Sequence, residues 1–298
     1  LGSGADFVCD GAADQAEFKQ AIATVSAAGG GIVEAFPGSY VLSAEVALLD
    51  SVTLRAQARR GAVLRMAVGV VGAEGHVVSR GRHDVHVEGF VIDGAANGVQ
   101  TNGIMFVTDA HPQDGQRTIG FSARDNLVRV KKESHSYGIW SSRGQDGLIT
   151  DNQVEGGYTA ADWLEIASTN TWATRVLDQE LIELYGSIRV RVVGNRCIGG
   201  SNAGIFVGSL MNNVFAIVED CVVEGNTIVD CQHAIQCPIV YGPGLGDLGW
   251  GGFDRLVIAH NTVARAHVSG VDVFIASNGQ PLGLDRPFVG GILVHANT

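Results

Sequence analysis

The sequence predicts an all-β protein, a right-handed parallel β-helix whose coils stack along one axis. A short pattern recurs: a strand, an asparagine at a corner, a second strand, then a Gly-Ile or similar pair opening a third strand. A clear copy runs from Val222 through Asn226 to Ile235. Such a repeat indicates a solenoid, because each copy lacks a core of its own and gains one by stacking. Crossovers between parallel strands favour right-handed coiling.

The spacing of the copies supports a coil with one fixed side and one variable side. Six corners are each followed by an apolar residue that we expect to point inward: Phe90 with Ile104, Asn126 with Ile139, Asn152 with Leu164, Asn195 with Ile205, Asn226 with Ile235, and Asn261 with Val271. Corner and inward residue lie 9 to 14 positions apart, whereas the distance to the next corner varies from 13 to 31. We expect each asparagine to adopt the left-handed conformation and to bond the next coil. The alternative is a β-sandwich with Asn-rich turns.

Composition agrees with short apolar strands joined by turns. The 298 residues are 46% hydrophobic but only 7% aromatic, and 41 are glycine, which is unfavourable for a helical bundle. The net charge of −11 argues against binding to nucleic acid or polyanionic sugars, and would suit Ca²⁺ or a neutral glycan. No apolar run has membrane-spanning length, and no signal peptide is recognisable.

The five cysteines are expected to be buried thiols. They form no Cys-x-x-Cys pair, and their number is odd. Several lie in or beside repeat strands, where a small apolar residue is needed. Disulfides or a metal site are the alternative.

We expect one domain over residues 1–298, with 1–43 forming an N-terminal cap and first strands and 44–298 forming coils. Asp14 is expected to cap a helix in which Phe18, Ala21, Ile22 and Val25 share one face. A single amphipathic helix before a solenoid would cover its exposed end. The last copy, at 290–295, has no such cover, so we expect a further segment or another chain, as in a homotrimer, to protect it.

The N-terminal region resembles a known signature. Residues 5–43 combine an Asp-Gly turn, the helix after Asp14, a Gly-Gly-Gly-Ile-Val run, and Phe36-Pro37-Gly38-Ser39-Tyr40. This arrangement is similar to the start of the pectate-lyase-like superfamily, which includes polysaccharide lyases, galacturonases, alginate epimerases and phage tailspikes. The resemblance extends over essentially the whole chain. It implies a right-handed parallel β-helix, a polysaccharide partner, and an extracellular or virion-associated location.

Four insertions, at 109–118, 169–188, 209–215 and 241–254, are expected to follow the same strand of the coil and to wall a groove. Residues just after the inward column should face outward. Aromatic rings there would stack on sugars while polar groups bind hydroxyls, so this column predicts a substrate-binding track. Its members are Met105, Trp140, Glu165, Phe206, Gln236 and Asp272. Alternatively, the rings pack beneath the loops.

A second column lies two residues before the inward one: Asn102, Tyr137, Asp162, Ala203, His233 and Ser269. Tyr137 and Asp162 should be about 5 Å apart on adjacent coils. With Glu165 and His135 they form the predicted catalytic group, and His233 and Arg143 are added to the substrate-binding set. A carboxylate separation of about 6–10 Å would suit inverting hydrolysis. Asp162 as a turn residue and Glu165 as a solvated side chain are the alternative.

The sequence therefore predicts a polysaccharide-acting enzyme, a lyase or a glycoside hydrolase, that binds a glycan along the outer face of the β-helix. Proton abstraction from a uronate, or protonation of a glycosidic oxygen, requires such a group beside the substrate. A non-catalytic glycan-binding tailspike or adhesin is the alternative. No cofactor is expected, although Ca²⁺ stays open, and neither nucleic acid nor a membrane is an expected partner.

Overall fold

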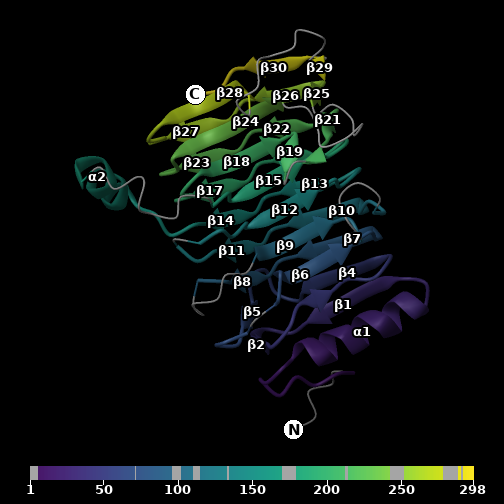
Figure 1. Ribbon diagram of the computed structural model, residues 1–298. Helices are drawn as coiled ribbons and strands as arrows, with labels where there is room; N and C mark the ends of the chain where they lie inside the picture. The colour runs from purple at the N-terminus through teal and green to yellow at the C-terminus, as the bar shows by residue number, and fades with distance from the viewer. Residues whose placement is uncertain are drawn as a thin grey trace.

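The fold is a parallel β-helix with three long sheets. The computed structural model describes residues 6–70, 72–95, 102–109, 115–132, 134–169, 179–211, 214–241, 252–277, 288–289 and 291–298. Each coil supplies one strand to sheets A, B and C in turn, so strands far apart in sequence lie side by side (Figure 1). Apolar residues from Phe18 to Ile292 form one continuous core cluster, as expected for stacked coils.

Sheets A and B are parallel throughout. In spatial order, sheet A contains β1 (Gly31–Ala35), β4 (Val52–Ala56), β7 (His83–Glu88), β10 (Ile119–Arg124), β13 (Leu148–Thr150), β16 (Arg191–Val193), β22 (Val222–Glu224), β26 (Leu256–Ala259) and β30 (Ile292–His295). Sheet B contains β2 (Gly38–Leu42), β5 (Ala62–Met66), β8 (Val91–Asp93), β11 (Leu127–Arg129), β14 (Gln153–Glu155), β17 (Arg196–Ile198), β23 (Thr227–Val229) and β27 (Thr262–Ala264).

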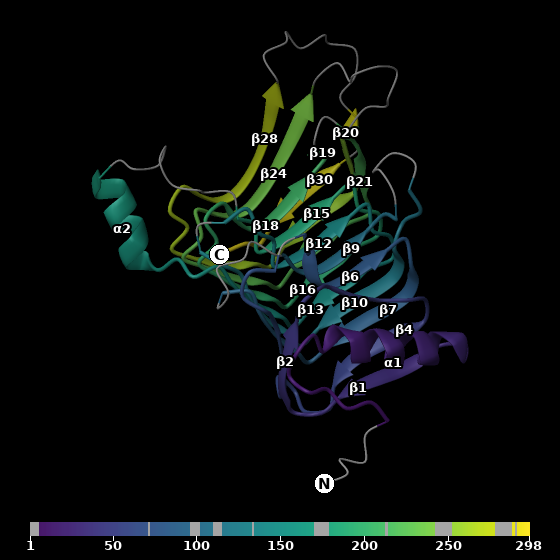
Figure 2. The same ribbon diagram turned by 60° about the horizontal axis from the view of Figure 1, so that its bottom comes forward.

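Sheet C is the third long parallel sheet and carries the candidate site. Its strands are β3 (Val46–Ala47), β6 (Gly75–Arg80), β9 (Asn102–Val107), β12 (Ile139–Ser142), β15 (Ile182–Tyr185), β18 (Ala203–Gly208), β24 (His233–Tyr241) and β28 (Ser269–Ser277). β24 and β28 are nine residues each and extend beyond the shorter strands of the other coils (Figure 2). Smaller elements are the hairpin β19 (Leu210–Met211) with β20 (Val214–Phe215), and the sheet β21 (Ile217–Glu219), β25 (Gly252–Asp254) and β29 (Phe288–Val289).

Helix α1 (Gln15–Ala27) covers the N-terminal end of the stack, as predicted (Figure 1). Phe18, Ala21 and Ile22 are buried against the first coil. The expected capping role of Asp14 is wrong, because its side chain makes no cap hydrogen bond. Its oxygens accept the amides of Gly11 and Val41 at 2.8 and 2.7 Å, so this buried carboxylate ties the N-terminal segment to β2.

The corners between sheets A and B form a ladder of asparagines, which are buried from Asn126 to Asn261. Each side-chain amide donates to the next asparagine oxygen at 2.9–3.1 Å, through Asn126, Asn152, Asn195, Asn226, Asn261 and Asn297. The predicted bonding to the next coil is confirmed. The left-handed residue is instead the one before each asparagine, as at Asp125 and Asp151, with φ of 58° and 57°. The turn is therefore made first, and the asparagine then points into the stack.

The insertions do not all follow the same strand. Those beginning near 109, 209 and 241 leave sheet C toward sheet A, whereas the longest separates β14 from β15 and leaves sheet B toward sheet C. Parts of the insertions, residues 110–114, 170–178, 212–213 and 242–251, lie outside the described residues. Insertions thus occur at both edges of sheet C rather than at one.

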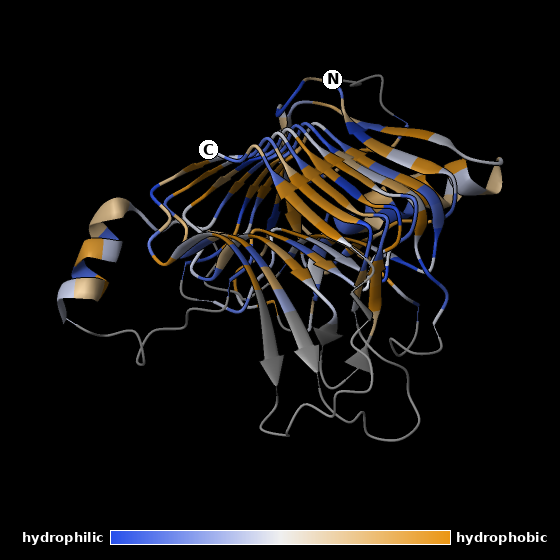
Figure 3. Ribbon diagram, turned by 90° about the horizontal axis from the view of Figure 1, so that it is seen from above, coloured by the Kyte–Doolittle hydropathy of each residue, from blue (hydrophilic) through white to orange (hydrophobic). Residues whose placement is uncertain are grey.

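Two further observations complete the fold. Seen along the stack (Figure 3), strands of the three sheets surround an interior, and the buried apolar side chains of the core cluster fill it. At the C-terminal end, Leu293 and Val294 of β30 are 54% and 43% exposed. Among the described residues, no helix is both long and apolar enough to span a bilayer.

Candidate functional site on the outer face of sheet C

Two columns of side chains lie on the outer face of sheet C. Register places Met105, Trp140, Glu183, Phe206, Gln236 and Asp272 side by side on successive coils. Ile182 fills the inward position between Ile139 and Ile205. Five of the six predicted outward residues are therefore in place, and Glu183 occupies the position that the sequence assigned to Glu165.

The other predicted column faces the same side. The rings of Tyr137 and Trp140 are 5.1 Å apart, and Asn102 Nδ2 lies 3.5 Å from Met105 Sδ. The backbone bends between the two columns, where several coils carry glycine. A Cβ on Gly138 would lie 2.2 Å from Val154 Cγ1, and one on Gly204 would lie 2.4 Å from Ile228 Cγ2. Glycine therefore lets sheet C begin close against sheet B, and the residue before it turns outward.

The predicted strand at 162–165 is instead part of helix α2 (Ala160–Thr169). Thr159 and Asp162 bond reciprocally at its start: Thr159 N donates to Asp162 Oδ2 at 2.9 Å, and Asp162 N lies 3.4 Å from Thr159 Oγ1. This is a capping box, with Asp in place of Glu. The helix buries Trp163 and Ile166, and Trp163 Nε1 donates to Asp230 O at 2.7 Å. α2 therefore docks at the sheet B to sheet C corner, beside the stack (Figures 1 and 2).

This helix removes Asp162 and Glu165 from the predicted catalytic column. Asp162 Oδ1 accepts from Lys132 Nζ at 2.6 Å. Partial burial opposes ionisation, but the hydrogen bonds from Lys132 and Thr159 outweigh it and lower the pKa of Asp162. Glu165 is exposed, as is the neighbouring Leu164, which was expected to point inward. Their predicted strand positions are wrong, because a local capping signal and an apolar helix face outweighed the repeat pattern.

Two glutamates that the sequence did not single out occupy these vacated positions. Glu180 precedes Ile182 by two residues and Glu183 follows it, and both side chains are 5% exposed. Glu183 lies between Trp140 and Phe206 in the column. Glu180 Oε1 accepts from Asn202 Nδ2 at 2.6 Å. Two buried carboxylates thus lie on one coil, with an aromatic side chain on each neighbouring coil.

The aromatic residues border this acidic pair closely. Tyr137 and Trp140 belong to the preceding coil and Phe206 to the following one. Phe206 Cε1 lies 2.5 Å from where a Cβ on Gly208 would be, so its ring leans across the next outward position. Only a residue without a side chain leaves room for this orientation. The Trp140 indole nitrogen is buried without a hydrogen-bond partner in the described structure.

Beyond Phe206 the face becomes polar. His233 Nδ1 lies 2.7 Å from Ser269 Oγ and 3.6 Å from Asp272 Oδ2, and Ser269 Oγ donates to Asp272 Oδ2 at 3.3 Å. Burial lowers the pKa of His233, while the charge of Asp272 opposes this shift. Gln236 lies between Phe206 and Asp272 in register. Four predicted binding residues, Phe206, Gln236, Asp272 and His233, are therefore neighbours on this face.

His135 and Arg143 belong to neither of the two columns on sheet C. His135 is exposed in the segment before β12. Arg143 lies at the corner toward sheet A with a left-handed φ of 57°, and its carbonyl accepts from Arg117 Nη1 at 2.9 Å. Its stem packs beside Gly186. The described contacts of Arg143 thus belong to the corner and not to the column.

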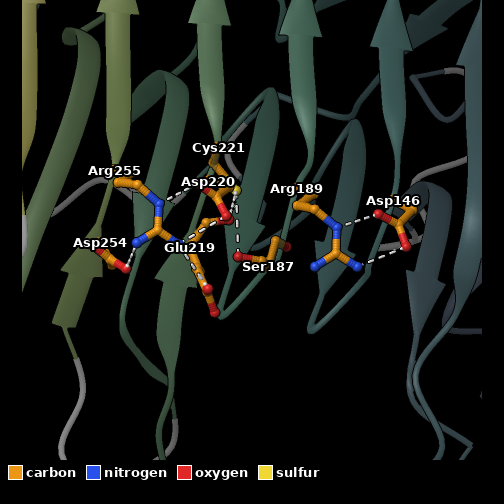
Figure 4. Close-up of polar contacts among 8 residues, drawn as sticks. All are labelled: Asp146, Ser187, Arg189, Glu219, Asp220, Cys221, Asp254 and Arg255. Carbon is orange, nitrogen blue, oxygen red and sulfur yellow. Dashed lines mark hydrogen bonds and ion pairs between the residues drawn. The ribbon is translucent and has the colours of Figure 1, made fainter.

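A second acidic region lies at the sheet C to sheet A corner, but arginines neutralise it. Figure 4 shows Arg189 pairing with both oxygens of Asp146, and Arg255 contacting Glu219, Asp220 and Asp254. Hydrogen bonding by Arg255 lowers the pKa of Asp220. Each of these carboxylates is held by a guanidinium, so the cluster connects coils and offers no acid–base pair.

A cavity lies at the N-terminal end of the stack. About 600 Å³ in volume, it is lined mainly by apolar side chains between α1, β1 and the N-terminal segment. At its edge, Cys9, Asp14 and Glu17 place ligand atoms within 4.8 Å of one another, the one group among the described residues able to hold a metal. Asp14 is already engaged by two backbone amides. All five cysteines are free thiols, as predicted, and four of them are buried.

Comparison with known proteins identifies the fold. The sequence matches no family model and no curated protein sequence. Among solved structures, it superposes on the Agl-KA catalytic domain over 87% of this chain and 46% of that one, with 11% identity and a TM-score of 0.54. The tailspike of E. coli bacteriophage HK620 matches over 98% and 64%, with 12% identity and a TM-score of 0.52. Rice weevil pectin methyl esterase matches over 95% and 85%, with 10% identity and a TM-score of 0.50.

The chain therefore has a right-handed parallel β-helix fold, as the sequence predicted. It spans about half the length of Agl-KA and under two thirds of the tailspike. At these identities the likeness concerns the fold alone. Function has to be argued from the site.

Proposed function

We propose that this protein cleaves a polysaccharide bound along the outer face of sheet C, with Glu180 and Glu183 as its acid–base pair. One observation carries the proposal: two carboxylates that are almost fully buried lie on one coil, with Trp140 and Phe206 on the neighbouring coils. Aromatic rings beside carboxylates suit a pyranose, which presents apolar faces and polar edges.

The contacts support a different role for each glutamate. Asn202 donates to Glu180 Oε1, and an amide donor suits a carboxylate that receives a proton from an attacking water. Glu183 lies between the aromatic residues, where it would protonate the departing glycosidic oxygen. Solved structures of the same fold include an α-1,3-glucanase from Streptomyces thermodiastaticus, of which this chain spans 46% at 18% identity with a TM-score of 0.50. The net charge of −11 also favours a neutral glycan over a uronate polymer.

The direct test compares Glu180→Gln and Glu183→Gln with the unchanged protein on neutral glucans and uronate polymers. New reducing ends report hydrolysis, and absorbance of an unsaturated product reports a lyase. Each substitution should lower turnover at least about 100-fold, because general acid–base catalysis contributes about that much or more. Glu165→Gln is the matched comparison on α2, and it should turn over like the unchanged protein. Loss of activity in Glu165→Gln alone would restore the assignment made from the sequence.

The alternative is a glycan-binding β-helix without turnover, as the tailspike likeness allows. Its supporting observation is the Asn202–Glu180 hydrogen bond, which could serve binding alone. Calorimetry with the same glycans separates the two. Binding that survives in Glu183→Gln, with no product formed by the unchanged protein, would favour the alternative. Light scattering would also show whether the protein is a trimer, as that alternative predicts.

A further inference from the structure

A serine, a histidine and an aspartate meet at the polar end of the sheet C face. His233 opens β24 and Ser269 opens β28, and the two are register partners on adjacent coils. The 2.7 Å separation of Ser269 Oγ and His233 Nδ1 is a close hydrogen bond. Asp272 Oδ2 lies 3.3 Å from the serine oxygen and 3.6 Å from the same histidine nitrogen. The glutamate pair lies on another coil and uses none of these groups.

The Ser269 hydroxyl has one hydrogen, which can point to Asp272 Oδ2 or to the closer His233 Nδ1, and the second orientation is the one that activates the serine. A hydroxyl is a weak nucleophile unless an adjacent base takes its proton. Burial lowers the pKa of His233, so its imidazole is neutral at neutral pH and able to accept that proton. Asp272 would then offset the positive charge that forms on the ring. The hydroxyl, the base and the charge partner are each partly exposed and so within reach of a ligand.

A second serine–histidine contact in the same chain shows what is special here. Ser122 Oγ lies 2.9 Å from His86 Nδ1 on sheet A. Burial lowers the pKa of His86 as well. Ser122 has no described carboxylate partner, however, whereas Ser269 Oγ lies 3.3 Å from Asp272 Oδ2. The pair on sheet C is therefore the one arranged for chemistry, and the pair on sheet A serves as an internal control.

We propose that Ser269 is an acyl-transfer nucleophile, with His233 as its base, and that this end of the face removes ester-linked acyl groups. The choice of an acylated glycan as the natural substrate rests on the proposed function, whereas the reactivity of Ser269 does not. Gln236 lies beside Asp272 in register, and its amide oxygen is buried without a hydrogen-bond partner in the described structure. An amide there can turn its NH₂ group toward the oxyanion that forms.

The step balances without a cofactor. Ser269 Oγ attacks the ester carbonyl carbon while its proton passes to His233 Nδ1. The bond from the carbonyl carbon to the alcohol oxygen breaks, and the alcohol leaves with the proton from His233. Water then attacks the acyl-serine, giving one proton to His233, and the carboxylic acid is released as Ser269 regains its hydrogen.

The experiment treats the full chain with a fluorophosphonate probe and locates the adduct by peptide mass spectrometry. We expect the adduct on Ser269, with hydrolysis of p-nitrophenyl acetate in parallel. Ser269→Ala should abolish the adduct and lower ester hydrolysis at least about 100-fold, and His233→Gln should slow labelling to a similar degree. Ser122→Ala should label and hydrolyse like the unchanged protein. Thermal unfolding of each variant shows whether it is folded.

Absence of an adduct on Ser269 would overturn the proposal, and so would labelling at the same rate in folded His233→Gln protein. If His233→Gln fails to fold, the Ser269→Ala result decides, because loss of one hydroxyl leaves the strand pairing intact. Glycan turnover without an adduct on Ser269 would refute this inference alone. An adduct on Ser269 in a protein that cleaves no glycan would refute the proposed function alone.

Discussion

The corner between sheets A and B and the outer face of sheet C are both built from columns of polar side chains, yet the columns differ in kind. At the corner the same residue recurs from Asn126 to Asn297, and each amide bonds to the next. On sheet C the column changes at every coil, from Trp140 through Glu183 and Phe206 to Asp272. Every coil has to pair its polar groups at the corner, so the same residue recurs there. The outward positions of sheet C do not have to meet this requirement, so they can differ from coil to coil and serve recognition.

The largest effect on stability should come from breaking the uniform column. Asn226 Oδ1 accepts from the backbone and side chain of Asn195, and its Nδ2 donates to Val192 O and Asn261 Oδ1. Asn226→Ala leaves several buried groups unpaired, so the free energy of unfolding should fall by about 3 kcal/mol. Chemical denaturation measures this loss. Thr227→Ala on the next residue is the control, and an equal loss there would show that the ladder has no special weight.

The sequence predicted this ladder because the asparagines recur at a spacing fixed by the coil. It predicted the sheet C column only where that spacing held. Between Asn152 and Asn195 an insertion places the third strand of the coil at residue 182 instead of 164. The apolar segment around Trp163, which is helical, was mistaken for that strand. A signal for the helix was present, since Thr159 and Asp162 have capping-box spacing. The alternation of Ile182, Glu183 and Leu184 could also have located Glu183.

Substitutions in the sheet C column should change the free energy of unfolding little but should weaken glycan binding. Trp140→Ala removes a partly exposed ring beside the acidic pair, and glycan affinity should fall about tenfold, or about 1.4 kcal/mol. Calorimetric titration with the preferred glycan measures the change. Phe36→Ala, at the N-terminal end where the ring is 40% exposed, should bind like the unchanged protein. Equal losses in both variants would place the binding surface elsewhere.

The pH dependence of stability should separate the effect of the buried histidines from that of the paired aspartate. Burial lowers the pKa of His76, which is inaccessible to solvent and donates Nδ1–H to Asn102 O. The unfolded chain therefore takes up this proton first, and stability should decline as pH falls below about 6.5 while staying level above it. Arginine pairing lowers the pKa of Asp230, a nearly buried residue, so its contribution to stability is lost only below about pH 4.

His76→Gln should flatten the upper of these two pH windows, as followed by denaturation at several pH values. Burial also lowers the pKa of His86, His233 and His267, so these residues should keep part of the slope. His83→Gln, at a side chain that is 53% exposed, serves as the control. A slope unchanged in His76→Gln would assign the window to the other histidines.

The smallest effect is expected at the sheet C to sheet A corner, where the Asp146–Arg189 ion pair of Figure 4 joins two coils at the surface. Asp146 and Arg189 pair through two hydrogen bonds, but their side chains are 42% and 48% exposed. Water and salt screen such a pair, so Asp146→Asn should leave the unfolding midpoint unchanged. Asparagine also tolerates the left-handed φ of 55° at this position, so the substitution tests the charge alone. A clear drop would mean that the arginine contacts act together across coils, and the corner would then resemble the asparagine ladder rather than the sheet C face.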